Sequence, residues 1–477
     1  MRAKKTVSYL AGFAAIFVLT ACGESDQSIA ALPNAVSTSV PATEYASDVP
    51  GITEAMLVPD FWLQRLSDDR VRMSNQQIRE FNTANFASDP YLHRLDDFPQ
   101  TLPKEEVVAL IDKVSAPASS PRVFVDGREV SAADYADLEA AVQRDAIPQV
   151  VPVRWGVAVA RASMRSYPTS ERVLKHIEDQ DLDRFQETGV FPGQRLVILH
   201  ESANGNWWFA LNYHYGAWIP KRAVALGDRD AINDWFQHVP RLTVTGAQVR
   251  TNFNPEDART SEVVLDMGVS LPLLSAAEVG HNVHGQNPYA SYIVSLPVRG
   301  EGGKLEFEPT LIGRGRDVSV GYLPYQPSVI LQQAFKFLGE RYGWGHDYNG
   351  RDCTGFVGEV YKSVGILMPR NSGQQGLSDF APTRRFGPDD HAAREKALTE
   401  LSVGDLIYIP GHVMMYIGDV DGEPYVIHDV TGLSYYRDDN TFYQGTLSGV
   451  SVTPLMPLQL TNEKRFIDGI YAIKSII

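Results

Sequence analysis

Short apolar runs separated by turn residues fill the middle of this chain and restrict that part to small antiparallel β units. The first series includes Val157–Val159, Leu196–Leu199 and Trp207–Leu211, with Gly, Asn and Pro between them. A second series of similar runs follows it along the chain. Many short strands with frequent turns are typical of small β-barrels. We therefore predict two barrel modules in succession, over residues 148–236 and 237–323.

Helical patterns precede the predicted barrels. Ser74 is a suitable helix N-cap, and Lys104–Val114 and Ser131–Val142 each place apolar residues on one helical face. These signals predict a helical N-terminal domain over residues 51–147.

The last part of the chain, residues 324–477, mixes both patterns. Val329–Leu338 predicts one helix, a second helix begins at Cys353, residues 366–400 are predicted as a loop, and a β region runs from Gly404. With 477 residues, the chain is long enough for several separate cores. The predicted fold class is α+β multidomain: a helical N-terminal domain, two small β-barrels and a C-terminal α+β domain.

The N-terminus has the pattern of a targeting segment rather than of a fold element. A basic start precedes the apolar run Tyr9–Leu19, which is too short to span a bilayer as a permanent helix. Leu19-Thr20-Ala21-Cys22 resembles the lipobox of bacterial lipoproteins, in which the cysteine is acylated. The alternative is an ordinary secretory signal with an incidental cysteine.

The lipobox resemblance implies a signal peptide over residues 1–21 and lipidation of Cys22. Residues 22–50 are rich in Ala, Ser, Thr and Pro and predict a flexible tether. Acyl chains on Cys22 would hold the protein on a membrane. Gly23 after the cysteine implies, by the same resemblance, a periplasmic protein on the outer membrane of a Gram-negative bacterium.

Charge and cysteine content exclude some classes of partner and of stabilisation. The formal net charge is −15, which disfavours nucleic acid as a partner because phosphate binding needs clustered Lys and Arg. The chain has two cysteines, and with Cys22 used for lipid, Cys353 has no partner for an intrachain disulfide. No cluster of His, Cys and carboxylates has the spacing of metal ligands, so no metal or cofactor is expected.

Cys353 lies at the predicted start of an amphipathic helix. Asp352 is a suitable N-cap, and apolar residues follow Cys353 at helical spacing until Gly365. The first helical turn would favour a thiolate and could receive an oxyanion, although the charge of Asp352 opposes the thiolate slightly. The alternative is a buried structural cysteine, which is common in protein cores.

Two histidines lie on strands that form a predicted hairpin. His412 opens one strand, Asp421-Gly422 is a turn signal, and His428 lies on the returning strand. A two-residue loop without irregularity would put the two histidines on opposite faces of the sheet. A three-residue loop or a β-bulge would put them on the same face, and we predict one of these.

Six short motifs resemble, in this order, those of the NlpC/P60 cysteine peptidases. They are Gly343-Trp344-Gly345, Arg351-Asp352-Cys353-Thr354-Gly355-Phe356, Met368-Pro369-Arg370-Asn371-Ser372, Gly404-Asp405-Leu406, Gly411-His412-Val413 and Val426-Ile427-His428. The family has a papain-like fold and cleaves bacterial cell-wall peptides between γ-D-glutamate and an L-diamino acid, often meso-diaminopimelate. Further similarity at residues 164–169 and 265–268 and at Phe61-Trp62 implies the lipoprotein subgroup with an N-terminal stabilising domain and two SH3-like barrels.

The resemblance assigns roles to residues of the C-terminal domain. It implies that Cys353 is the nucleophile, His412 the general base and His428 the residue that orients the base. It also implies a substrate groove lined by Tyr342, Trp344, Asp352, Thr354 and Ser372, in which Asp352 could pair with a substrate ammonium. His346 stands where a third glycine is commoner, and is interpreted as a loop histidine.

The resemblance further implies that the first barrel walls one end of the groove and demands a free N-terminal L-Ala. Arg165, Asp183 and Trp208 are the candidates for this contact, and a barrel salt bridge and a core aromatic are the alternatives. The expected partners are stem peptides or muropeptides, and the acidic composition favours soluble fragments over intact wall. Two other functions remain open: a non-catalytic peptidoglycan-binding lipoprotein, and another papain-like amidase or acyltransferase.

Overall fold

The computed structural model describes residues 45–476. The predicted signal peptide, Cys22 and most of the predicted tether lie outside the described residues. No helix within residues 45–476 combines the length and the apolarity needed to cross a membrane.

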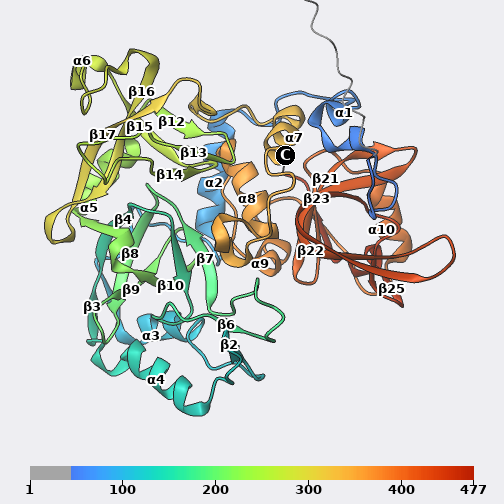
Figure 1. The fold of residues 1–477 in the computed structure, drawn as a ribbon, viewed down its shortest axis with the longest axis horizontal. Helices are drawn as coiled ribbons and strands as arrows, with labels where there is room; N and C mark the ends of the chain where they lie inside the picture. The colour runs from blue at the N-terminus through green and yellow to red at the C-terminus, as the bar shows by residue number, and fades with distance from the viewer. Residues whose placement is uncertain (1–44, 477) are drawn as a thin grey trace, which may run out of the picture. The chain divides into compact units, whose positions relative to one another are not determined.

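Seven antiparallel strands form the first barrel, in the order β11-β4-β8-β9-β10-β5-β7 (Figure 1). Every residue of the central strand β9 is buried, which fits its continuous apolar sequence. The strands are β4 (Arg154–Ala158), β5 (Ala162–Arg165), β7 (Gln186–Val190), β8 (Arg195–Glu201), β9 (Trp207–Leu211), β10 (Gly216–Pro220) and β11 (Val224–Gly227).

A five-stranded sheet with an additional strand pair follows the first barrel. The sheet has the order β17-β16-β15-β12-β18, and its core includes Leu242, Leu271 and Leu296. Its strands are β12 (Arg241–Val244), β15 (Ser270–Leu274), β16 (Ser291–Arg299), β17 (Leu305–Gly313) and β18 (Val318–Val320). The additional pair is β13 (Gln248–Arg250) and β14 (Val264–Asp266), and α5 (Arg229–Gln237) and α6 (Ala276–Val279) complete this part.

The N-terminal segment divides its apolar residues between two cores. Trp62 and Ile78 pack with residues of the C-terminal domain, whereas Val107, Leu138 and Val142 pack with aromatic residues of the first barrel. Ser74 caps its helix as predicted, in a reciprocal capping box with Gln77. The elements are α1 (Pro59–Leu63), α2 (Asn75–Ser88), α3 (Lys104–Asp112) and α4 (Ala132–Val142), with the short strands β1 (Thr101–Pro103), β2 (Val123–Phe124) and β3 (Val150–Pro152); β2 pairs with β6 (Val173–Leu174).

In the C-terminal domain, one antiparallel sheet packs against helix α8. The strand order is β19-β26-β20-β21-β22-β23, and the apolar stripe of α8 packs in one core with residues of β21 and β22 (Figure 1). The strands are β19 (Thr383–Arg385), β20 (Leu406–Ile409), β21 (His412–Val420), β22 (Glu423–Tyr436), β23 (Phe442–Pro454) and β26 (Ala472–Lys474), and β24 (Gln459–Thr461) pairs with β25 (Lys464–Arg465).

The helices of this domain are α7 (Pro327–Phe335), α8 (Cys353–Ser363), α9 (Ser372–Leu377) and α10 (His391–Leu398). The prediction of a loop over residues 366–400 is therefore wrong, because α9 and α10 lie within it. The predicted α+β multidomain fold class is confirmed.

The predicted irregularity in the histidine hairpin is a β-bulge. Val420 pairs with Glu423 across the two-residue turn, but beyond Ile417 the register shifts by one, so that Met415 pairs with Ile427. Because side chains alternate between the two faces of a strand, this single extra residue puts His412 and His428 on the same face.

Candidate active site

The rings of His412 and His428 are joined by a direct hydrogen bond. His412 Nε2 lies 2.8 Å from His428 Nδ1. The His428 side chain is buried, so packing fixes its orientation. This bond uses Nε2 of His412 and leaves its Nδ1 as the nitrogen that can exchange a proton with another group.

Cys353 is the first residue of helix α8 and lies beside the start of strand β21. The backbone N–H of Val413, the residue after His412, hydrogen bonds to the Cys353 sulfur. Asp352 caps the helix as predicted, since its side chain accepts the N–H of Gly355 at 2.8 Å. Cys353 therefore lies beside the backbone segment that carries His412.

The surroundings keep both the thiol and the imidazole neutral. Burial, followed by the charge of Asp352, raises the pKa of the Cys353 thiol to about 12, against the opposing effect of the Val413 N–H. Removal from water lowers the pKa of His412 to about 4. Burial and the charge of Asp352 thus oppose the thiolate that the helix N-terminus is predicted to favour. From this neutral pair, the thiol proton would pass to His412 as the sulfur attacks a substrate.

Alkylation of Cys353 should consequently be slow at neutral pH. We expect iodoacetamide to react more slowly than with a free cysteine, whose pKa is about 8.5, and the rate to keep rising above pH 10. Mass spectrometry of the labelled peptide over a pH series measures this, with the Cys353→Ala variant as the blank. A rate that is already maximal below pH 7 would instead indicate a preformed thiolate–imidazolium pair.

Four donors hold the carboxylate of Asp352. Oδ1 accepts from Gly355 N–H and from Thr354 Oγ1 at 3.1 Å, and Oδ2 accepts from Gly345 N–H at 3.0 Å and from Arg370 at 2.7 Å. Burial opposes ionisation, but the Arg370 guanidinium holds the pKa of this carboxyl well below its usual range. A carboxylate offers about four acceptor sites, so an ammonium would have to displace one of these donors. These donors fix the position of the Asp352 carboxylate; its predicted contact with a substrate ammonium stays a prediction.

Comparison with known families assigns the part of the chain that carries these residues. Residues 339–452 match the NlpC/P60 family, and residues 172–220 match an SH3 domain of the SH3b1 type. Residues 339–452 are an NlpC/P60 domain. The segment contains Cys353, His412 and His428.

Individual relatives agree with this assignment. A γ-D-glutamyl-L-lysine dipeptidyl-peptidase of Bacillus cereus is 26% identical over 256 residues, which cover 49% of this chain and 65% of that protein. A probable endopeptidase p60 of Listeria seeligeri is 33% identical over 98 residues, 19% of this chain and 16% of its own length. The chain thus spans less than two thirds of the length of either relative. The structure of an NlpC/P60 endopeptidase from Photobacterium damselae subsp. piscicida has the same fold, with a TM-score of 0.69 at 15% identity, covering 87% of this chain and 96% of that one.

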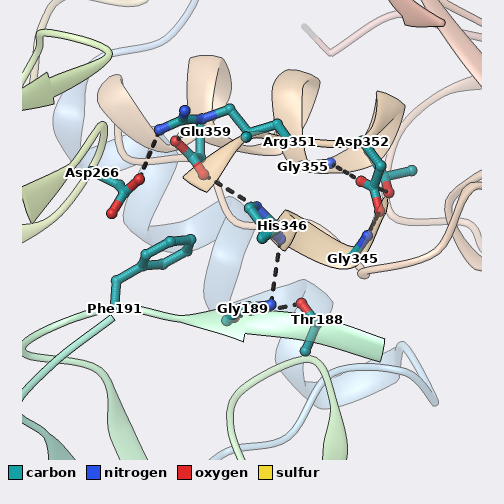
Figure 2. Close-up of polar contacts among 12 residues, drawn as sticks. Thr188, Gly189, Phe191, Asp266, Gly345, His346, Arg351, Asp352, Gly355 and Glu359 are labelled. Carbon is teal, nitrogen blue, oxygen red and sulfur yellow. Dashed lines mark hydrogen bonds and ion pairs between the residues drawn. The ribbon is translucent and has the colours of Figure 1, made fainter. Parts of the chain in front are cut away.

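Arg351, next to the N-cap of α8, connects the NlpC/P60 domain to the second β unit (Figure 2). Its side chain is 0% exposed and contacts Asp266 of β14 at 2.8 Å, Glu359 of α8 at 2.8 Å and Glu340 at 2.7 Å. Arg161 of the first barrel also reaches Asp266, at 3.3 Å. Two carboxylates of the NlpC/P60 domain and one of the second β unit therefore surround one buried guanidinium.

His346 lies in an irregular segment with a positive φ of 67°, as the interpretation as a loop histidine expects, and it is buried between α8 and strand β7 of the first barrel (Figure 2). Its Nε2 is 3.2 Å from Glu359, and its Nδ1 is 3.4 Å from the N–H of Gly189. A Cβ at Gly355 would lie 2.7 Å from Nε2. Burial, and then the charge of Arg370, hold the pKa of His346 well below its usual range, so the ring is neutral. The histidine fills the contact between the NlpC/P60 domain and the barrel.

The other predicted groove residues of the domain are only partly brought together. Burial, and then the charges of Asp352 and Cys353, raise the pKa of the Tyr342 phenol well above its usual range. The Tyr342 O–H therefore keeps its proton. Trp344 Nε1 donates to the carbonyl of Gln186 in the first barrel at 3.0 Å. Ser372 is the first residue of α9. Thr354 lies with Asp352, as described above.

The three residues predicted to contact substrate from the first barrel are buried within it. Arg165 and Asp183 form an internal ion pair of 2.8 Å, with side chains 7% and 0% exposed. Trp208 is 5% exposed in the barrel core, and its Nε1 donates to Glu201 at 3.3 Å. All three have structural roles, which corrects the predicted substrate contacts.

Sequence reasoning missed the polar residues that the barrel does turn toward the domain. Tyr215 donates a hydrogen bond to the carboxylate of Glu187. Burial raises the pKa of Glu187, and the charge of Arg370 opposes part of this effect. Arg370 also donates to Thr188 at 2.7 Å. Arg370 lay inside a recognised motif, but nothing near Glu187 in the sequence distinguishes it from other acidic residues.

Within residues 45–476, no three His, Cys, Asp or Glu side chains are grouped so as to hold a metal ion.

Proposed function

We propose that this protein is a cysteine endopeptidase that cleaves the γ-D-glutamyl–L-diamino acid bond of peptidoglycan stem peptides. One observation carries the proposal: His412 and His428 are hydrogen bonded to each other, and the residue after His412 contacts the thiol of Cys353 at the start of α8. The name of the Bacillus cereus relative supports a γ-D-glutamyl bond, and the SH3b1-type match supports a cell-wall substrate.

The geometry supports an acyl-enzyme mechanism. Cys353 Sγ attacks the γ-carbonyl carbon as its proton passes to Nδ1 of His412, and His428 keeps the imidazole oriented. The N–H groups at the start of α8 and the phenol of Tyr342 are donors for the oxyanion. His412 returns the proton to the leaving amine. Water then attacks the thioester, loses its proton to His412, and the thiol is restored.

The first barrel would contribute a contact to the N-terminal side of the substrate. We propose Glu187 for this contact in place of Arg165, Asp183 and Trp208, because the charge of Arg370 in the NlpC/P60 domain acts on its carboxyl. An approaching ammonium would restore the ionised form that burial opposes. A free N-terminal L-Ala in the stem peptide supplies such a group.

Defined stem peptides test the cleaved bond. Incubation of L-Ala-γ-D-Glu-meso-diaminopimelate, with a free or an acetylated N-terminus, should release L-Ala-γ-D-Glu from the free peptide and much less from the acetylated one. Mass spectrometry identifies the products. Release of L-Ala alone, or of D-Ala from a longer peptide, would show a different amidase and contradict the proposed bond specificity.

We further propose that acylated Cys22 holds the protein on the outer membrane, facing the periplasm. The position of Cys22 directly after the apolar run supports this. Wild-type protein should fractionate with outer membranes and the Cys22→Ser variant should not; equal fractionation of the two would refute the anchor.

A further inference from the structure

A third side chain extends the histidine pair away from Cys353. Thr453 Oγ1 lies 3.0 Å from Nε2 of His428, whose Nδ1 bonds to His412. Thr453 and His428 are both buried, at 0% and 1% exposure, so water does not compete for this bond. The three side chains form one continuous hydrogen-bonded row.

The strand register explains why Thr453 is the partner. His428 pairs with Ser451 across β22 and β23, and Thr453 is two residues further along, on the same face. The Ser451 hydroxyl donates to the carbonyl of Gly449 at 3.1 Å and is not bonded to the histidine. Two hydroxyls thus face the same side of the sheet, and one of them contacts His428.

The hydrogen atoms in this row can be arranged in two ways, and only one of them leaves His412 able to act as a general base. For Nδ1 of His412 to accept a proton, its neutral ring must carry hydrogen on Nε2 and donate it to His428 Nδ1. His428 must then carry its own hydrogen on Nε2. Nε2 faces Thr453, so the Thr453 oxygen must accept that hydrogen. In the reverse direction Nδ1 of His412 is already protonated and cannot take the thiol proton.

We propose that Thr453 is a positioning residue that fixes the tautomer of His428, and through it that of His412, by accepting the hydrogen on His428 Nε2. The proposal rests on the general-base role of His412 in the proposed function. A hydroxyl suits the task because it is uncharged: it orients the two rings without stabilising an imidazolium, as a carboxylate would.

Three variants separate this role from simple packing. Thr453→Val keeps the shape but removes the acceptor, so kcat on the stem peptide should fall roughly 10-fold to 100-fold with little change in KM, the range seen when outer partners of metal-binding histidines are removed. Thr453→Ser should stay within about threefold of wild type. Ser451→Ala, which removes the neighbouring hydroxyl, should leave kcat unchanged. A Thr453→Val variant with wild-type kcat would overturn the proposal.

Nitrogen NMR of the histidine side chains gives a readout independent of hydrolysis. In protein labelled with ¹⁵N-histidine, His428 should carry its proton on Nε2 in wild type and in Thr453→Ser, and should shift toward the Nδ1 form in Thr453→Val. A wild-type His428 protonated on Nδ1 would overturn the proposal even if Thr453→Val failed to fold. If wild type showed no Cys353-dependent hydrolysis, the proposed function would fail, and the NMR result alone would decide the role of Thr453.

Discussion

Replacement of Cys353 by alanine is expected to abolish stem-peptide hydrolysis and leave the fold intact. The sulfur is the atom that would form the thioester, and loss of a catalytic nucleophile lowers kcat by roughly 10⁴-fold to 10⁶-fold in enzymes of this kind. The side chain contributes little else: its polar contact is with the N–H of Val413. Product formation followed by mass spectrometry measures the loss, and circular dichroism checks the fold.

The Ser451→Ala variant is the matched control, because it removes a part-buried polar atom from the same domain. Hydrolysis by Cys353→Ala at a rate near that of wild type would exclude a thiol mechanism. It would favour a peptidoglycan-binding lipoprotein contaminated by another hydrolase, or a different nucleophile.

Replacement of Arg351 by methionine should destabilise the protein more than any change at its surface. The guanidinium is fully buried, and its removal leaves the carboxylates of Asp266 and Glu359 close together without their shared cation. Breaking a buried ion pair from one side costs about 3–5 kcal/mol of unfolding free energy. Urea denaturation monitored by tryptophan fluorescence measures the change.

An exposed arginine provides the control for this variant. Arg70 pairs with Asp68 at 2.9 Å but its side chain is 83% exposed, so Arg70→Met should leave the urea midpoint unchanged. A similarly small effect for Arg351→Met would mean that the buried carboxylates take up protons or water at little cost, and that the cluster does not hold the parts together.

The sequence patterns that correctly predicted the elements around this site are short-range ones. The apolar stripe after Cys353 and the capping residue Asp352 define α8, because both signals lie within one helix. The bulge at Ile417 agrees with the predicted irregularity. That prediction used the alternation of side chains along a strand and the assumption that both histidines lie on one face of the sheet. Helix α9 was missed because it has only six residues, which is too short for a periodic signal.

Contacts between distant segments could not be predicted in the same way. Asp266 lies 85 residues before Arg351, and no local pattern links them. The neutral state of Cys353 depends on how deeply the fold buries the thiol, which the helix position alone does not indicate. Likewise, the ion pair of Asp352 requires Arg370, which comes close to it only in the folded chain.

The location of Trp62 has a consequence for how the chain folds. Trp62 lies far before β21 and β22 in the sequence, yet its side chain is 1% exposed in the core that these strands complete, with its ring centroid 5.4 Å from that of Tyr425. A nascent chain that ends before residue 400 cannot bury it. Contacts that join the two ends of a chain slow folding and prolong the exposure of apolar surface. We expect this core to close only after the C-terminal strands are available, so Trp62 and its neighbours stay exposed until then.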